Sequence, residues 1–88
     1  MQIVKCAVAG TMESGDAYIE LEPFADGIEI AYESPVAGQF GDTIEAAARA
    51  VLSECGVKTA KLFIRDRGAL DCVLRARIET AVRRGGDA

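Results

Sequence analysis

The sequence contains no histidine and no tryptophan, and aromatic residues make up only 6% of its 88 residues. Without histidine the usual general base is missing, so nucleophilic schemes of the Ser-His and Cys-His kind are excluded. The few aromatic side chains supply little surface for base stacking. The net charge of −4 also lacks the basic surface that nucleic-acid binding needs. We therefore expect no catalysis by this chain alone and no nucleic-acid partner.

Long apolar runs and clustered cysteines are also lacking. No apolar run approaches the ~20 residues of a membrane-spanning helix, and residues 1–6 show no basic region followed by a long apolar stretch. The thiols of Cys6, Cys55 and Cys72 are widely spaced, and zinc would find only thiolates and carboxylates as ligands. We expect no membrane contact, no signal peptide, no metal site and, with three reduced thiols, a cytoplasmic location.

Hydrophobic periodicity switches between two patterns along the chain. Alternation of apolar and polar residues, as at Ala17, Ile19 and Leu21, predicts half-buried strands. Apolar residues on one helical face, with an N-cap at Asp42 and a C-terminal stop at Gly56, predict a helix. The patterns together predict strands around residues 3–9, 17–22, 28–33 and 61–66, and helices over residues 42–55 and 69–84.

The predicted order β-β-β-α-β-α limits the possible folds. A chain this short forms one domain, which we place at residues 1–84, with a flexible tail at residues 85–88. Each helix is apolar on one side and needs a sheet face to cover. The apolar stripe of the second helix comprises Leu70, Val73, Leu74, Ile78, Ala81 and Val82. We expect an α+β fold, a two-layer α/β sandwich with a four-stranded mixed sheet and both helices on one face.

Ser14 lies in the predicted loop between the first two strands, where serine is common for structural reasons alone. Gly15 adds no side chain beside its hydroxyl, and the tip of a hairpin is accessible to a large enzyme. Three carboxylates lie in or near this loop: Glu13, Asp16 and Glu20. Such a cluster can bind metal or exchange protons, but a solvated acidic surface is the better interpretation.

Two further side chains are candidates on the second helix. Arg77 lies nearer the apolar stripe than Arg75, so we expect Arg77 to be the one held in an ion pair or an interface. Cys72 stands beside Val73 and Leu74, which predicts a buried or boundary thiol rather than a nucleophile.

Three stretches carry a family resemblance: residues 9–16 (AGTMESGD), Gln39-Phe40-Gly41, and above all residues 66–78 (DRGALDCVLRARI). In their order and separations they resemble the citrate lyase acyl carrier protein (gamma subunit). In that family the serine after a Gly-Thr-x-Glu pattern carries a covalent 2'-(5''-phosphoribosyl)-3'-dephospho-CoA group, which the resemblance assigns to Ser14. Family members commonly have a second serine where this chain has Gly15, so the choice of serine is unambiguous here.

The resemblance implies an acyl carrier subunit of the citrate lyase complex. Such a subunit holds acetyl and citryl thioesters on its prosthetic group while citrate is cleaved to acetate and oxaloacetate. The implied partners are the alpha (acyl transferase) and beta (citryl lyase) subunits and a prosthetic-group transferase. The triplet Ser14-Gly15-Asp16 also resembles the carrier subunit of malonate decarboxylase. That function stays open as an alternative, as does a non-carrier structural subunit in which Ser14 is never modified.

Overall fold

The computed structural model describes residues 1–35 and 37–87, and the side chains of residues 1–35 and 41–87. Its elements follow the predicted order β-β-β-α-β-α. They are β1 (Ala7–Gly10), β2 (Ala17–Glu22), β3 (Ile28–Glu33), α1 (Ala37–Glu54), β4 (Ala60–Asp66) and α2 (Asp71–Gly85). The second and third strands have the predicted bounds, and the fourth differs by one residue.

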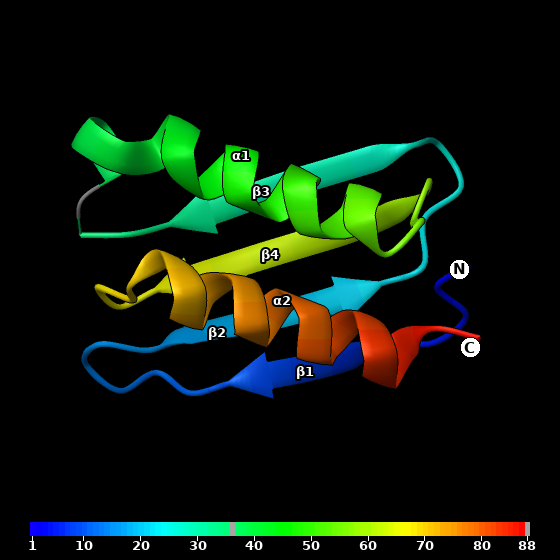
Figure 1. Cartoon of the computed structure of the whole chain (residues 1–88), viewed down its shortest axis with the longest axis horizontal. Coiled ribbons are helices and arrows are strands. Elements are labelled where there is room, and N and C mark those ends of the chain that lie inside the picture. The colour runs from blue at the N-terminus through cyan, green and yellow to red at the C-terminus, as the bar shows by residue number, and fades with distance from the viewer. Residues whose placement is uncertain (36, 88) are drawn as a thin grey trace.

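The four strands form one mixed sheet in the order β1-β2-β4-β3. β2 pairs antiparallel with β1 on one side and with β4 on the other. β3 runs parallel to β4, as expected for two strands joined through a helix. Both helices cover the same face of this sheet (Figure 1). The predicted two-layer α+β sandwich is therefore confirmed.

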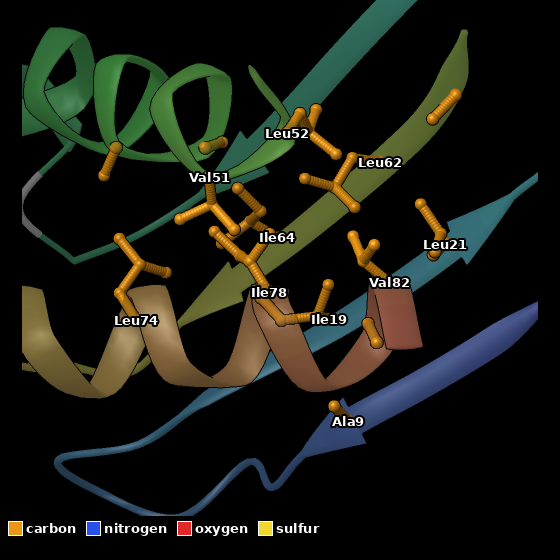
Figure 2. Packing of buried hydrophobic residues seen from close by; sticks show 14 of the residues in the cluster. Ala9, Ile19, Leu21, Val51, Leu52, Leu62, Ile64, Leu74, Ile78 and Val82 are labelled. Atoms are coloured by element: carbon orange, nitrogen blue, oxygen red, sulfur yellow. The ribbon is translucent and has the colours of Figure 1, made fainter. Parts of the chain in front are cut away.

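The hydrophobic core lies between the helices and the covered face of the sheet. Ile19 of β2 and Ile64 of β4 are register partners, and both are fully buried. Leu74, Ile78 and Val82 point from α2 toward these central strands (Figure 2). Burying each such side chain contributes about 1.5–3 kcal/mol. This packing holds α2 in place over the sheet, with its N-terminal end beside the β1–β2 loop.

The first helix begins at Ala37, so the prediction of an N-cap at Asp42 is wrong, and Asp42 lies inside α1. The predicted start rested on Asp42 and Glu45, whose spacing is that of a capping box. Gly41 packs against the ring of Tyr32, and a Cβ there would lie 2.6 Å from the Tyr32 Oη. A tertiary contact thus outweighs the local preference.

The first strand is shorter than predicted and begins at Ala7. Ile3 makes an isolated antiparallel bridge with Gly86, so the preceding segment pairs with the end of the chain rather than with β2. Ala88 lies outside the described residues, and the flexible tail expected at residues 85–88 stays a prediction.

The second helix spans Asp71–Gly85, close to the predicted residues 69–84. Two of its predicted burial states are wrong. Leu70 is not part of the buried stripe but the N-cap residue, and it is 71% exposed. Cys72 is an exposed thiol in the first turn, because it lies about 200° around the helix from the buried Leu74. In the described part of the chain, neither helix is long and apolar enough to cross a membrane.

Candidate functional site

Ser14 lies in the loop of residues 11–16 that joins β1 to β2 at one end of the molecule (Figure 1). Its side chain is exposed, as are those of Met12 and Glu13 in the same loop. A Cβ added at Gly15 would meet no atom within 4 Å, so the space beside Ser14 is open. This loop is therefore accessible to a large protein, as the sequence predicted.

Asp16 fixes the base of the loop. Its carboxylate accepts two hydrogen bonds from the Arg77 guanidinium, from Nε at 2.9 Å and from Nη2 at 3.0 Å. It also accepts from the Thr11 hydroxyl and from the Ala17 N–H, both at 2.8 Å. These bonds, that from Arg77 first, lower the pKa of Asp16 from 3.8 to about 2. The Asp16 side chain is only 14% exposed, but Arg77 is 41% exposed, so water screens this ion pair in part. The ion pair expected for Arg77 is confirmed, and Arg75 forms one as well, with Asp71 of the same helix.

Backbone hydrogen bonds hold the same loop against the neighbouring β4–α2 loop. The Gly15 N–H donates to the Arg67 carbonyl at 2.7 Å, and the Arg67 N–H donates to the Asp16 carbonyl at 2.9 Å. These bonds continue the β2–β4 ladder beyond its last register pair, Ala17 and Asp66. Within the loop, the Asp16 N–H donates to the Glu13 carbonyl at 3.1 Å. The residues before and after Ser14 are therefore fixed while its own side chain faces solvent.

Gly10 ends β1 and starts the turn into the loop. Its φ is +88°, a conformation that glycine adopts readily and other residues rarely do. A Cβ at this position would lie 1.8 Å from the Ala17 carbonyl oxygen. Only glycine fits this close approach. The glycine that precedes Thr11 at the start of the loop is therefore required for steric reasons.

Asp66 is a site residue that the sequence analysis missed. It is buried at the end of β4, where it accepts hydrogen bonds from the Ser34 hydroxyl at 2.6 Å and from the Ala69 N–H at 2.9 Å. These bonds shape the β4–α2 loop, against which the Ser14 loop rests. The alternation of Leu62, Ile64 and Asp66 was the available signal, since it puts a carboxylate on the buried face.

The three carboxylates predicted near the loop do not gather into one cluster. Asp16 pairs with Arg77, Glu20 forms an ion pair with Arg65, and Glu13 is exposed. Within the described residues, no group of three or more Cys, Asp or Glu side chains could hold a metal ion. Asp16 and Glu20 instead form ion pairs with basic partners.

Two of the three stretches that carry the family resemblance meet in space. Residues 9–16 form the end of β1 and the Ser14 loop, and residues 66–78 form the end of β4, the following loop and the first half of α2. The two are joined by the ion pair and the backbone bonds described above. The side chains of Gln39 and Phe40, from the remaining stretch, lie outside the described residues.

Comparison with known proteins agrees with this arrangement. The sequence model of the family described as "Malonate decarboxylase delta subunit" matches residues 4–85. The citrate lyase acyl carrier protein of Haemophilus influenzae (strain PittEE) is 49% identical over 99% of this chain and 90% of its own. The citrate lyase acyl carrier protein of Treponema denticola is 45% identical over 99% of both chains.

A solved structure shows the same fold. A chain from the crystal structure of a Pseudomonas malonate decarboxylase hetero-tetramer in complex with malonate aligns with a TM-score of 0.83 and 24% sequence identity. The alignment covers 97% of this chain and 89% of that chain. Since the family model and the relatives both span nearly all of the chain, this protein belongs to the family of small acyl carrier proteins that includes those of citrate lyase and the malonate decarboxylase delta subunit.

Proposed function

We propose that this chain is the acyl carrier subunit of a citrate lyase complex and that Ser14 carries its prosthetic group. The observation that carries the proposal is an exposed hydroxyl on a loop whose base is fixed by the bidentate contact of Asp16 with Arg77. The relatives named citrate lyase acyl carrier protein support the same function, because they match nearly the whole chain at 45–49% identity.

The proposed group is 2'-(5''-phosphoribosyl)-3'-dephospho-CoA, joined to Ser14 through a phosphodiester. When bound, the group supplies a terminal thiol that holds acyl chains as thioesters. When the group is attached, the Ser14 oxygen loses its proton and forms a bond to a phosphorus atom of the donor. The phosphoanhydride bond at that phosphorus breaks, and the outer phosphates of the donor leave. The site fits such a group, because the space beside Gly15 is open. In addition, Arg77 neutralises the Asp16 carboxylate, which would otherwise repel a nearby phosphodiester.

The chain's own contribution is to present the group, and we propose that it performs no acid–base chemistry. A general base must have a pKa near the working pH, and Asp16, with a pKa of about 2, is far from neutrality. The sequence offers no histidine to replace it. The related proteins are named as carriers, which supports the same division of labour.

The catalytic steps then belong to partner proteins. We propose that the alpha (acyl transferase) and beta (citryl lyase) subunits act in turn on the far end of the group, in the cytoplasm, and that a separate transferase attaches it. Tethering the thiol to a small domain gives each partner a high effective concentration of substrate. A rigid attachment loop keeps the origin of that tether in one place.

A carrier subunit of malonate decarboxylase is the second candidate. The description of the matching family and the fold of the Pseudomonas chain favour it. The sequence identities favour citrate lyase, at 45–49% against 24%. Co-expression with both sets of subunits from the same genome separates the two, and we expect stable co-purification with the citrate lyase alpha and beta subunits.

Intact-mass measurement on protein from the native host tests the site. We expect an added mass equal to the proposed group, and peptide mapping should locate it on Ser14. Ser14→Ala should remove the added mass and all citrate cleavage by the complex, because no phosphodiester can form on alanine. Its free energy of unfolding should change by less than about 0.5 kcal/mol, as at exposed positions generally.

Ser53→Ala is the matched control. Ser53 is also exposed but lies in α1, so this variant should keep both the group and the activity. A group mapped to Ser34 or Ser53, or an active Ser14→Ala complex, would contradict the proposal. An unmodified chain in the native complex would favour a structural subunit instead.

A further inference from the structure

Leu70 is exposed to a degree unusual for a large aliphatic side chain. It is 71% exposed, whereas the other exposed large hydrophobic residues described have values of 39–52%. Its exposure is not a consequence of the core, because the buried face of α2 starts at Leu74. A single exposed leucine is common on protein surfaces, so the meaning of this one depends on its position in the fold.

The backbone position of Leu70 makes the choice of leucine more unusual. Leu70 is the N-cap of α2, with φ −66° and ψ 155°, and its side chain makes no cap hydrogen bond. Serine, threonine, aspartate and asparagine are strongly preferred at such positions because their oxygens accept from the first free N–H groups of the helix. Leucine therefore contributes neither a cap nor core packing, and the stability of the free chain does not explain it.

Leu70 lies at the same end of the molecule as Ser14. The β4–α2 loop that carries Leu70 runs beside the β1–β2 loop (Figure 1), and the hydrogen bond from Gly15 to Arg67 joins the two. Met12, which is 47% exposed, stands in the β1–β2 loop two residues before Ser14. Two exposed apolar side chains thus lie on two adjacent loops, one of which carries the proposed attachment point.

The molecule is so small that any enzyme bound at this end must contact more than one loop. The chain measures 31 × 21 × 17 Å, and its total accessible surface is 4930 Å². A specific protein–protein interface buries about 800 Å² on each partner, which is more than the narrow end of this molecule offers in cross-section. An enzyme that encloses the Ser14 hydroxyl in its active site will therefore extend over the β1–β2 loop, which includes Met12, to the adjacent β4–α2 loop, which includes Leu70.

We propose that Leu70 and Met12 form the docking patch for the enzyme that attaches the prosthetic group to Ser14. The proposal rests on the function proposed above. It selects the attaching enzyme because that partner must reach the Ser14 oxygen itself, whereas the alpha and beta subunits need only reach the far end of the group. The complementary surface on the enzyme is an apolar pocket that takes up the Leu70 side chain and excludes water from it.

Leu70→Ser tests the patch with opposite effects on stability and on recognition. Serine at the N-cap should raise the midpoint of thermal unfolding of the free chain by about 4–8 °C. The same variant should lower kcat/KM for attachment by at least about tenfold, through KM rather than kcat, with purified transferase and its CoA-derived donor. Intact mass followed over time gives the rate. Met12→Ser should lower kcat/KM by a smaller factor.

Val4→Ser is the matched control at the other end of the molecule. Val4 is 52% exposed, and its N–H donates to the Gly85 carbonyl at the C-terminal end of α2. A helix of this length separates it from Leu70 by about 20 Å. Attachment to this variant should proceed at the rate of the wild-type chain.

Several outcomes would overturn the patch while leaving the proposed function intact. One is wild-type kcat/KM in Leu70→Ser, and another is an equal loss in Val4→Ser. Normal attachment combined with lost co-purification with the citrate lyase subunits would assign Leu70 to those subunits and end the proposal for the transferase. If the wild-type chain is never loaded at Ser14, the proposed function itself fails, and the patch fails with it.

Discussion

Two neighbouring residues of α2 serve two different regions of the molecule. Ile78 is fully buried in the core between the helices and the sheet (Figure 2). Arg77 is directed instead to the Ser14 loop, where it binds Asp16. The core is held by apolar contact that has little directionality, and the loop is held by a small set of directed polar bonds. The first region should be sensitive to volume, and the second to charge and to backbone conformation.

The difference explains how a small carrier combines rigidity with access. A hydrophobic contact would fix the Ser14 loop only by burying its side chains. The bonds to Asp16 and to the Arg67 backbone fix the loop at its base and leave the tip in solvent. Because α2 is locked by Leu74, Ile78 and Val82, the guanidinium that holds the loop is attached to the most rigid part of the molecule.

The largest effect on stability is expected from Ile78→Ala, which removes volume from the core. This change should reduce the free energy of unfolding by about 2–5 kcal/mol, because it loses buried apolar area and leaves a cavity. Urea denaturation measures it. The effect should be nearly the same at pH 3 and pH 7, since no charge is involved. An effect below about 1 kcal/mol would show that the helix is not held by this packing.

Asp16→Asn should have an intermediate effect that depends on pH. The pKa of Asp16 is about 2 in the folded chain, below its ordinary value of 3.8, so the ionised form stabilises the fold. That stability is fully present above about pH 4 and is lost as the pH falls toward 2. Its upper bound is about 2 kcal/mol, and the true value is smaller because Arg77 is 41% exposed and water screens it. Urea denaturation of wild type and variant from pH 7 to pH 2 should show the deficit shrinking through this window.

Glu79→Gln is the control for the charge effect. Glu79 pairs with Arg83 one turn later on α2, and both side chains are exposed to water. A helical pair of this kind contributes about 0.3–0.5 kcal/mol to the free energy of unfolding. This variant should differ little from wild type at any pH. A deficit for Asp16→Asn that is constant down to pH 2 would mean that the loop depends on shape and not on the ion pair.

The same division separates what the sequence could predict from what it could not. Strands such as β2 were predicted to the residue because alternation reports directly on a half-buried surface. The start of α1 was not, because the contact of Gly41 with Tyr32 is invisible to local preference. The burial of Leu70 was predicted wrongly for a related reason. Its spacing places it on the apolar side of α2, but spacing alone does not show whether another part of the chain covers that position.

The site was predictable in part. The pattern of glycines indicated an exposed loop around Ser14, but the role of that serine came from resemblance to a family. Arg77 was expected in an ion pair because of its place beside the apolar stripe. Its partner, Asp16, is 61 residues away in the sequence, and helical or strand periodicity cannot predict a contact at that separation. The pair depends on how α2 lies across the sheet, and this is fixed only by the packed core.

Among the changes to the core, to the Asp16 ion pair and to the backbone of the loop, the smallest effect is expected from Gly15→Ala, which strains the loop without adding a clash. Gly15 has φ +85°, and its Cβ would point into open space. The left-handed conformation should lower the free energy of unfolding by about 1 kcal/mol. Gly27→Ala is the matched control, because Gly27 has φ +101° and equally open surroundings but lies between β2 and β3. The two variants should lose similar stability in urea.

If the conformation of the loop matters for presenting Ser14, the Gly15 variant alone should be loaded with the prosthetic group more slowly. Equal loading rates would mean that Asp16 and Arg67 hold the loop firmly enough to absorb the strain.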